Sequence, residues 1–441
     1  MLLKLLPVYG FFWAIAWWRL DTDFGWHLQA GNYIRANGIP AHDIFTYTAR
    51  NFSWIDHEWG NDVILSFLYQ HGGYLLASVF YAGLWTTAIF IIGRSLGLAT
   101  LLLATIALLP YAGIRPLVWS LLGFGLLLKL VARGSNKAKL LIPLLFIPWA
   151  NLHAGFVIGF IYLAYVAITK RSKSWGLVLL ACVLASFINA YGPRLYIEIA
   201  RTLLDPTLHK QIAEWEPLYI LVPSWAYIIV WCSGFWLFSK NKISNWYGFD
   251  SLLLLAGLSS SRNITLFVIG SMAHTDYYLK KAASMLPKKL SRISKLVLST
   301  IISAAILSII FGLIISFLPL SPRENAYPVQ AATYLEQRGC EGGNLFNDYD
   351  YGGYLIWKLP SQPVYIDGRM PSWRDPNGVK YLDTYFNVLK SAKTRQAQFS
   401  RYNIRCVLLS RSGTNLPMLK QLKKSGWKTI TQSNGAALLI K

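Results

Sequence analysis

The chain has 441 residues, of which 54% are hydrophobic and 14% charged, and its mean hydropathy is +0.38. Soluble globular proteins are about one quarter charged, so this composition excludes an ordinary soluble domain and indicates a membrane protein with many spans. A net charge of +22 would suit a nucleic-acid-binding protein. However, the lysines and arginines gather in short loops between apolar segments and form no basic face interleaved with aromatic residues. We therefore predict membrane lipids, and no nucleic acid, as partners.

The apolar segments predict a polytopic α-helical membrane protein with eleven transmembrane helices, since a span needs about 20 apolar residues. The first segment lacks a small-residue cleavage site and is followed by further spans, so we interpret it as a retained helix and not as a signal peptide. The predicted spans are 3–19, 74–93, 96–113, 116–132, 138–150, 155–169, 175–190, 221–238, 246–259, 263–279 and 296–318.

The basic residues predict the orientation, because Lys and Arg concentrate on the cytoplasmic side of membrane proteins. With eleven spans, the four basic loops at 133–139, 170–173, 240–242 and 280–295 all fall on one side. We therefore expect a multi-pass plasma-membrane protein with a cytoplasmic N-terminus and an extracytoplasmic segment beyond 321. Most acidic residues before 323 then lie outside, and many of them fall in the first outer loop, residues 20–73.

The first outer loop is unusually rich in carboxylates and histidines. We predict a surface helix over 25–37, which Asp21 or Asp23 could cap and which Gly38 would end. A second helix is expected after Asp56. Capping alone would explain either early aspartate, but charged groups held against a membrane tend to mark functional sites. The candidates in this loop are Asp21, Asp23, His27, His42, Asp43, Asp56, His57 and Glu58.

Glu58 and Asp62 of the same loop stand four residues apart, on one face of the expected second helix. Such a like-charge pair costs stability unless a cation or a basic group lies between the two carboxylates.

An Asp-x-Asp directly after the first span, followed by a long outer loop, resembles the GT-C superfamily of integral-membrane glycosyltransferases. The stretches "DTDFGWHLQAGNYIRANGIPAHDIFTYT" and "WIDHEW" are similar to a poorly characterised prokaryotic branch of that superfamily. So are "IRP" at 114–116, "NLHAGF" at 151–156, "NAYGPRLY" at 189–196, "EW" at 214–215, "RNITLF" at 262–267, "NDYDYGGYLIW" at 347–357 and "YIDGR" at 365–369. The resemblance covers nearly the whole chain.

The resemblance implies a donor sugar on a polyprenyl phosphate or pyrophosphate and a glycan, lipid or protein acceptor at the outer face. It also implies an inverting mechanism in which a first-loop carboxylate is the base; Asp23 is our first choice and Asp21 our second. The expected substrate-binding residues are His27, Asp56, His57, Glu58, Arg115, Asn151, His153, Glu214 and Arg262.

The last five of these residues fall at outer ends of spans in the orientation derived from charge alone. Arg115 and Arg262 suit the departing lipid phosphate, because Arg holds phosphate through two hydrogen bonds. Each could instead be a structural partner of a carbonyl or an acid. His153 could orient a substrate hydroxyl or simply form a packing hydrogen bond.

The resemblance does not decide whether this protein binds a metal, since some members of the superfamily use a metal and others do not. Asp21, Asp23 and Glu58 are the candidate ligands. Their oxygen atoms would favour Mg²⁺ or Mn²⁺ over zinc.

Residues 322–441 have the composition of a soluble α/β domain, distinct from the GT-C-like transmembrane domain predicted over 1–321. Helices are expected over 327–337, 380–402 (as two) and 415–425, with strands at 343–348, 363–369, 404–410, 427–433 and 436–441. Polar residues gather at the strand ends, as a ligand site or as turns: Asn347, Asp348, Asp350, Tyr351, Asp367 and Arg369. No sequence argument pairs Cys340 with Cys406.

Three other interpretations compete with a glycosyltransferase. An oligosaccharide ligase or polymerase uses similar donors. A lipid or polysaccharide transporter would place ionisable groups near the bilayer midplane and often shows repeated halves, neither of which we find. A purely structural scaffold is the third. The sequence identifies neither the sugar, the lipid, the acceptor nor the oligomeric state.

Overall fold

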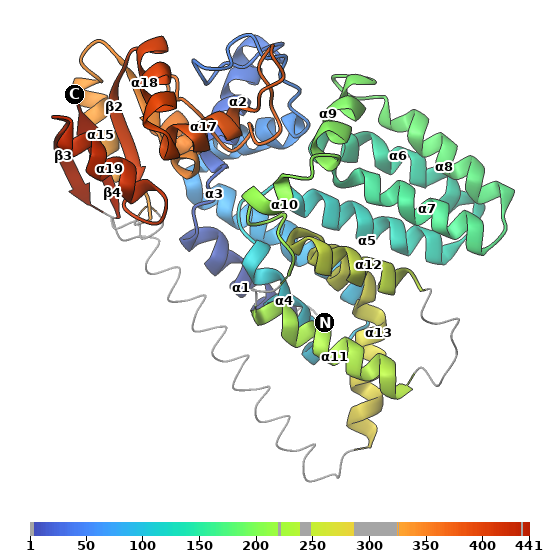
Figure 1. The fold of residues 1–441 in the computed structure, drawn as a ribbon. Helices are drawn as coiled ribbons and strands as arrows, with labels where there is room; N and C mark the ends of the chain where they lie inside the picture. The colour runs from blue at the N-terminus through green and yellow to red at the C-terminus, as the bar shows by residue number, and fades with distance from the viewer. Residues whose placement is uncertain (1–3, 219–221, 239–247, 286–323, 325, 434) are drawn as a thin grey trace. The chain divides into compact units, whose positions relative to one another are not determined.

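The computed structural model describes residues 4–218, 222–238, 248–285, 324, 326–433 and 435–441 (Figure 1). The chain forms two compact units. The first, called the helical unit here, comprises Met1–Arg19, Gly72–Tyr196 and Pro206–Pro319. The second, called the mixed unit, comprises Leu20–His71, Ile197–Asp205 and Leu320–Lys441.

This division differs from the boundary at 321/322 that the sequence suggested, because the first outer loop belongs to the same unit as the tail. The physical reason is that buried polar groups of the loop form hydrogen bonds and an ion pair with groups of the tail. Asp43 of the loop forms an ion pair with Arg369 of the tail at 2.8 Å, and the Tyr47 hydroxyl donates to the Leu345 carbonyl at 2.8 Å. The Asp43–Arg369 ion pair and the Tyr47 hydrogen bond both need the two segments together.

The helical unit consists of apolar helices with few charged residues. The longest, α3 (Trp59–Gly93), is two helices joined at a kink, because Gly72 and Gly73 have non-helical backbone angles; its first arm lies in the mixed unit. The others are α1 (Leu5–Trp18), α4 (Leu98–Leu108), α5 (Leu117–Arg133), α6 (Asn136–Leu152), α7 (Val157–Thr169), α8 (Lys173–Ser186), α10 (Leu208–Gln211), α11 (Val222–Phe238), α12 (Phe249–Ser259) and α13 (Ile264–Ser284), while α9 (Arg194–Leu203) runs from this unit into the mixed unit.

A helix occupies each predicted span before residue 286, whereas the span predicted at 296–318 lies outside the described residues. By length and hydropathy together, α3 is the one helix of the described part that could cross a membrane by itself. Several others are apolar but only 10–17 residues long. The predicted number of eleven spans is therefore not confirmed.

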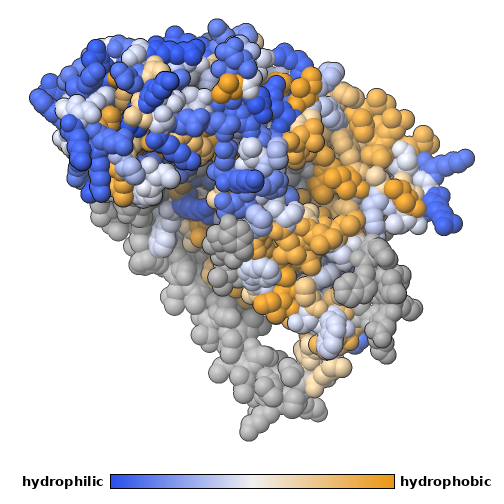
Figure 2. Space-filling view, viewed as in Figure 1, coloured by the Kyte–Doolittle hydropathy of each residue, from blue (hydrophilic) through white to orange (hydrophobic). Residues whose placement is uncertain are grey.

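The surface of the helical unit is apolar, as Figure 2 shows for the visible face. Large hydrophobic side chains point outward along α6, α7 and α8: Leu140 is 74% exposed and Ile168 is 75% exposed. An exposed apolar surface of this extent is unfavourable in water and favourable against lipid acyl chains. We therefore treat this unit as embedded in a membrane.

Two of the basic loops lie at the same end of the helical bundle. Lys139 and Lys170 both place their ammonium groups over the ring of Trp175, at 5.1 and 5.5 Å. Lys139 also donates to the Ser174 hydroxyl at 2.9 Å. The loop after α5 and the loop after α7 therefore share one face, as the charge pattern predicted for these two loops.

The tail folds around a four-stranded sheet with the order β1-β2-β4-β3. β1 (Asn344–Asn347) is parallel to β2 (Ile404–Ser410), and β4 (Ala436–Ile440) pairs antiparallel with both β2 and β3 (Lys428–Ser433). The helices are α15 (Val329–Arg338), α16 (Gly352–Lys358), α17 (Tyr381–Lys390), α18 (Ala392–Arg401) and α19 (Asn415–Lys424). The α/β class predicted for the tail is confirmed.

The strand predicted at 363–369 is wrong, because this segment does not join the sheet. Val364 forms an isolated parallel bridge with Thr46 of the first outer loop. Its N–H donates to the Phe45 carbonyl at 2.9 Å, and its carbonyl accepts from the Tyr47 N–H at 3.2 Å. An apolar run bounded by turn residues predicts a strand. Here, however, the backbone hydrogen-bond partners of the run lie in the first outer loop and not in the sheet.

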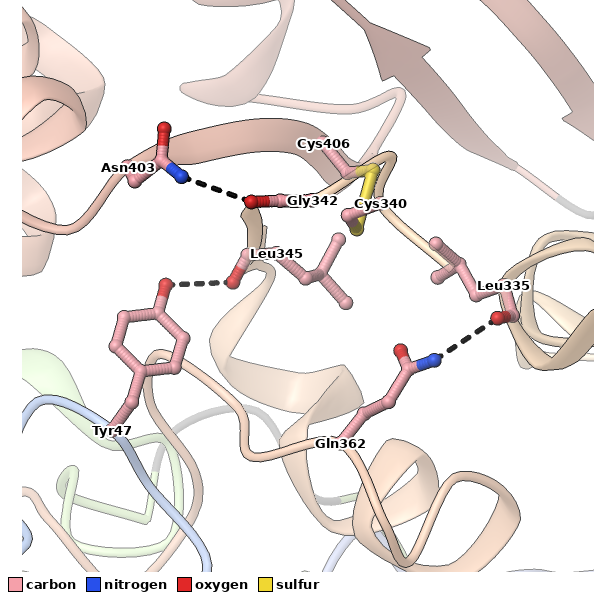
Figure 3. Close-up of a disulfide and its surroundings, with 8 residues drawn as sticks. All are labelled: Tyr47, Leu335, Cys340, Gly342, Leu345, Gln362, Asn403 and Cys406. Atoms are coloured by element: carbon pink, nitrogen blue, oxygen red, sulfur yellow. Dashed lines mark hydrogen bonds between the residues drawn. A yellow bond between two sulfur atoms is a disulfide. The ribbon is translucent and has the colours of Figure 1, made fainter. Parts of the chain in front are cut away.

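A disulfide joins Cys340 to Cys406, at the start of β2 (Figure 3). Two hydrogen bonds near the disulfide also connect parts of the tail. The Asn403 side-chain amide donates to the Gly342 carbonyl at 3.0 Å, and the Gln362 side-chain amide donates to the Leu335 carbonyl at 3.1 Å. The bridge spans 66 residues of sequence. Disulfides persist in oxidising compartments, so this bond fits a tail outside the cytoplasm.

Candidate functional site

Asp21 and Asp23 lie at the start of α2 (Phe24–Asn37), in the mixed unit. Asp23 is the N-cap residue of this helix, yet its carboxylate makes no capping hydrogen bond. Instead Asp23 Oδ1 accepts a hydrogen bond from Trp26 Nε1 at 2.9 Å, and Asp21 Oδ1 accepts from the Asp23 N–H at 3.0 Å. Both side chains are half-buried. Capping, the simplest explanation for an aspartate here, therefore does not account for Asp23.

Two glycines fix α2 between its neighbours. A Cβ at Gly25 would collide with the Gly353 carbonyl of α16, and one at Gly31 would collide with the Asp62 carbonyl of α3. The helix ends at Gly38, whose φ of 82° is a left-handed conformation that glycine adopts without strain. Close backbone contacts on two sides hold the Asp21–Asp23 turn at the end of a rigid helix.

His27, one turn after Asp23, lies between two carboxylates of α3 and its approach. His27 Nδ1 is 2.6 Å from Asp62 Oδ1, and His27 Nε2 is 3.5 Å from Glu58 Oε2. The ring is buried and stacks on Trp26 with centroids 3.6 Å apart. His27 is thus the basic group between Glu58 and Asp62 that the sequence required.

Asp56 completes the buried cluster. Its Oδ1 accepts the Glu58 N–H at 3.2 Å, whereas its Oδ2 is buried with no hydrogen-bond partner in the described part of the chain. Burial raises the pKa of Asp56 well above its usual value, and the negative charge of Asp62 raises it further. Both effects favour the protonated form of Asp56. His57 points outward beside it, 3.7 Å from Glu58 Oε1.

Arg369 links the tail to the first outer loop. Its guanidinium donates to both oxygens of Asp367, at 2.8 and 2.7 Å, and to Asp43 Oδ1 at 2.8 Å. The Trp54 and Phe45 rings lie 4.5 and 4.8 Å from its central carbon. The two carboxylates raise the pKa of Arg369 against the opposing effect of burial. This buried, fully charged group anchors the "YIDGR" segment and is not available to a ligand.

The polar residues at the end of β1 are also structural. Asp348 Oδ2 accepts from the Ser410 N–H at 2.9 Å and from Asn415 Nδ2 at 2.8 Å. Asn347 Nδ2 donates to the Ile366 carbonyl, and its Oδ1 accepts from the Tyr365 N–H, both at 2.8 Å. These contacts favour the turn interpretation of "NDYDYGG" over the ligand interpretation.

In the helical unit, Arg115 and Arg262 both contact Glu214, Arg115 through the carboxylate and Arg262 through the backbone. Arg115 Nη2 donates to Glu214 Oε1, while the Arg262 N–H donates to the Glu214 carbonyl at 3.1 Å. The Arg262 guanidinium lies 4.8 Å from the Trp215 ring, and it interacts electrostatically with Glu214, as does Arg19. Arg115 therefore pairs directly with the Glu214 carboxylate, while the charges of Arg262 and Arg19 act on it electrostatically.

His153 and Asn151 have structural contacts. His153 is buried, its Nδ1 lies 2.6 Å from the Ser120 hydroxyl, and it accepts the Gly155 N–H at 3.0 Å. Asn151 Nδ2 donates to the Ile188 carbonyl at 2.8 Å. These contacts supply the packing role that the sequence had left as an alternative for His153.

The metal prediction has no geometric support in the described residues. No three of their His, Cys, Asp or Glu side chains are arranged to hold a metal ion. Asp21 and Asp23 each use one oxygen for a nearby N–H, and His27 separates Glu58 from Asp62. We therefore derive no chemical step through Mg²⁺ or Mn²⁺.

Comparison with solved structures identifies the fold. The archaeal oligosaccharyltransferase AglB from Archaeoglobus fulgidus, in complex with an inhibitory peptide and a dolichol-phosphate, aligns with a TM-score of 0.59 over 92% of this chain and 69% of that one, at 12% sequence identity. The apo form of the oligosaccharyltransferase aligns with a TM-score of 0.57 over the same shares, also at 12% identity.

A third structure of that enzyme, tethered to an acceptor peptide containing the NVT sequon, gives a TM-score of 0.55 over 92% of this chain and 68% of its own, at 12% identity. This chain has the GT-C fold. The fold predicted from the resemblance to the GT-C superfamily is thereby confirmed. No protein-family model matches the chain, and no curated protein matches it by sequence.

Sequence reasoning missed three residues that the structure brings into these clusters. Asp62 was noted only for its repulsion with Glu58, and Arg369 only as a strand-end residue. Arg19 was not considered, although its position directly before the Asp-x-Asp was a usable signal. Arg19 Nη1 donates to the Pro110 carbonyl at 2.5 Å, which ties the end of α1 to the loop after α4.

Proposed function

We propose that this chain is a membrane glycosyltransferase of the GT-C type, which moves a sugar or oligosaccharide from a polyprenyl-phosphate-linked donor to an acceptor. The single observation that carries the proposal is the Asp-x-Asp turn after α1, in which Asp23 has the capping position without making a capping bond. A half-buried carboxylate held at the end of a rigid helix, with its Oδ1 oriented by the Trp26 indole N–H, suits proton abstraction.

In the proposed reaction, Asp23 takes the proton of the acceptor nucleophile as it attacks the anomeric carbon of the donor sugar. The bond to the lipid phosphate breaks on the opposite face, so the configuration inverts. Asp21 supports the same turn through its bond to the Asp23 N–H.

The departing phosphate gains negative charge, which requires cations or N–H donors. Arg115, Arg262 and Arg19 all act electrostatically on Glu214, and Arg115 also donates to it directly. We propose that this cluster holds the lipid phosphate, because guanidinium groups bind phosphate oxygens in pairs.

The acceptor class remains to be assigned among glycan, lipid and protein. One solved neighbour holds an acceptor peptide and another a dolichol-phosphate. These two structures favour a lipid-linked donor and make protein the first acceptor to test. They also support the alternative of an oligosaccharide ligase, since an oligosaccharyltransferase transfers a whole oligosaccharide.

We also propose that the tail and the first outer loop are extracytoplasmic. The disulfide and the charge distribution support this orientation. Single cysteines at Asn51 and Ser412 should react with an impermeant thiol reagent in intact cells, whereas one at Ser284 should not. The reverse labelling pattern would contradict the orientation and the outward site with it.

Activity is tested with the purified full chain in detergent. The donor is a lipid-linked glycan extract from the native membranes, and mass spectrometry follows its consumption and the appearance of glycosylated peptide, lipid or glycan. Addition of EDTA, followed by Mg²⁺ or Mn²⁺, tests the metal prediction in the same assay. Donor consumption that appears with the chain and disappears with heat-denatured chain supports the proposal; no consumption with any acceptor would contradict it.

A further inference from the structure

The mixed unit has an open groove of about 620 Å³, which the reaction proposed above does not use. One wall is the loop 47–53, and the facing wall is formed by residues of the segment 374–384. Tyr365 and three residues at the end of α18, Gln398, Arg401 and Tyr402, complete the lining. All of these residues belong to the mixed unit.

The walls of the groove are fixed by contacts behind it. Phe52 stacks on Trp373 with ring centroids 4.2 Å apart. The Thr48 hydroxyl donates to the Tyr365 carbonyl at 2.6 Å, and the Tyr365 hydroxyl donates to Gln398 at 3.2 Å. A groove whose walls are already ordered loses little conformational entropy on binding a ligand.

The groove carries an excess of positive charge. Three arginines line it, Arg50, Arg374 and Arg401, against one acid, Asp375. Asp375 Oδ1 is engaged by the Asn377 and Val379 N–H groups at 2.9 Å each. Among the described residues, no carboxylate forms an ion pair with any of the three arginines.

Lys380, which is close in sequence to Arg374, differs from the three arginines in its burial and in its ion pair. Lys380 is buried and forms an ion pair with Asp205. Arg50, Arg374 and Arg401 are instead exposed. Arg374 is held at the groove by its hydrogen bond to the Gly378 carbonyl at 2.8 Å, and Arg401 lies 5.2 Å from the Tyr402 ring centroid. The three arginines are thus free to meet an anion from solvent.

Aromatic rings line the groove between these charges. The rings of Tyr47, Tyr365 and Tyr402 pack against one another, with centroids 6.0 Å apart for Tyr47 and Tyr365 and 5.5 and 6.1 Å from Tyr402. Tyr402 and Tyr381 line the groove and are each half-buried, so part of each side chain is accessible. The face of a sugar ring is apolar with slightly positive C–H groups, which fit against the negative face of an aromatic ring. Planar amide and guanidinium groups suit its hydroxyls.

We propose that this groove binds an acidic glycan, with its acidic groups on the three arginines and its ring faces on the half-buried aromatic side chains. A peptide is disfavoured, because peptides often add to a free strand edge and no residue of the described strands lines the groove. This inference rests on the proposed function, because a glycosyltransferase works on glycans. Binding to the groove is nevertheless measured without any sugar transfer.

The test is a binding titration of the purified full chain in detergent with three probes: a hexamer of galacturonate, a neutral maltohexaose and a hexamer of glutamate. We expect the galacturonate hexamer to bind at least ~10-fold more tightly than either other probe, because hydrogen bonds between charged groups are stronger than those between neutral groups. Its affinity should also fall with added salt.

Variants locate the site. Arg50→Gln and Arg401→Gln should each weaken binding of the galacturonate hexamer by about 10-fold, and Tyr402→Leu should weaken it at unchanged salt dependence. Arg411→Gln is the matched control, since Arg411 is exposed in the same unit and does not line the groove. These variants leave the Asp21–Asp23 turn intact, so a transfer assay that fails while binding persists would refute the proposed function alone.

Three outcomes would overturn the assignment. Equal affinity for maltohexaose would mean that the arginines do not select an acid. Tighter binding of the glutamate hexamer would identify the groove as a peptide site. Absence of galacturonate binding, or binding that Arg50→Gln and Arg411→Gln weaken equally, would remove the groove as a glycan site.

Discussion

Gly368 leaves the space that the Asp23 carboxylate occupies: a Cβ added at Gly368 would collide with Asp23 Oδ1. The backbone of Gly368 does not require a left-handed conformation, so the glycine is needed for space and not for its φ. The neighbouring residues Asp367 and Arg369 fix this backbone through the ion pair with Asp43. The tail therefore helps to set the position of the proposed base.

We predict that Gly368→Ala displaces the Asp23 carboxylate and lowers glycosyl transfer by about 10²-fold, the scale of a misplacement of about 1 Å at a reacting group. The change should act on kcat more than on KM for the donor. Gly176→Ala is the control, because a Cβ there meets no atom within 4 Å. Wild-type transfer by Gly368→Ala, in a sample shown to be folded by its melting temperature, would argue against Asp23 as the base.

The arginine cluster in the helical unit predicts a different kinetic effect. Arg262→Gln should raise KM for the lipid-linked donor by about 10-fold or more, since a charged hydrogen bond to the phosphate is lost. Glu214→Gln should lower that KM, because the cluster becomes more positive. Donor titrations at saturating acceptor measure both. An unchanged KM in both variants would mean that the lipid phosphate binds elsewhere.

The disulfide predicts a stability effect confined to one pair of cysteines. Cys340→Ser with Cys406→Ser removes a cross-link over 66 residues. On the chain-entropy model this costs about 4 kcal/mol of unfolding free energy. Cys232→Ser is the control, since Cys232 is unpaired and exposed. Thermal unfolding followed by scanning fluorimetry should show a large loss for the double variant and little for the control; equal melting temperatures would show that the bond does not form.

Asp56 predicts an unusual pH dependence. Its folded pKa is raised above the unfolded value of 3.8, by burial first, then by Asp62 and Glu58, against the lowering effect of His27. The folded state therefore holds a proton that the unfolded state releases, and stability falls as pH rises from about 4 through the folded pKa.

Asp56→Asn removes this pH-dependent contribution to the unfolding free energy, while the asparagine side chain still offers an oxygen to accept the Glu58 N–H. The variant should gain melting temperature relative to wild type as pH rises from 4 to 7. Each pH unit inside the window is worth about 1.4 kcal/mol. Melting curves at several pH values measure the difference. A difference that stays constant with pH would mean that Asp56 is not held neutral.

The sequence predicted the helices and the tail's α/β class because both depend on local periodicity and turn residues. The helix after Asp23 and its end at Gly38 follow from such local signals. The partners of Asp43 and His27 could not be predicted, since Arg369 and Asp62 come from segments 326 and 35 residues away. The compact units divide the chain differently from the predicted boundary at 321/322, because composition separates a polar tail from an apolar chain but does not show that a polar loop packs with that tail.

The role of Asp23 is the central claim, and Asp23→Asn tests it most directly. Asparagine keeps an oxygen for the Trp26 indole N–H, so the turn and the melting temperature should be preserved. It cannot accept the acceptor's proton, so the rate of sugar transfer should fall by at least ~10²-fold, with Asp21→Asn as the companion variant. Wild-type transfer rates in both variants would contradict the account and direct the search for the base to Glu58 or Asp56.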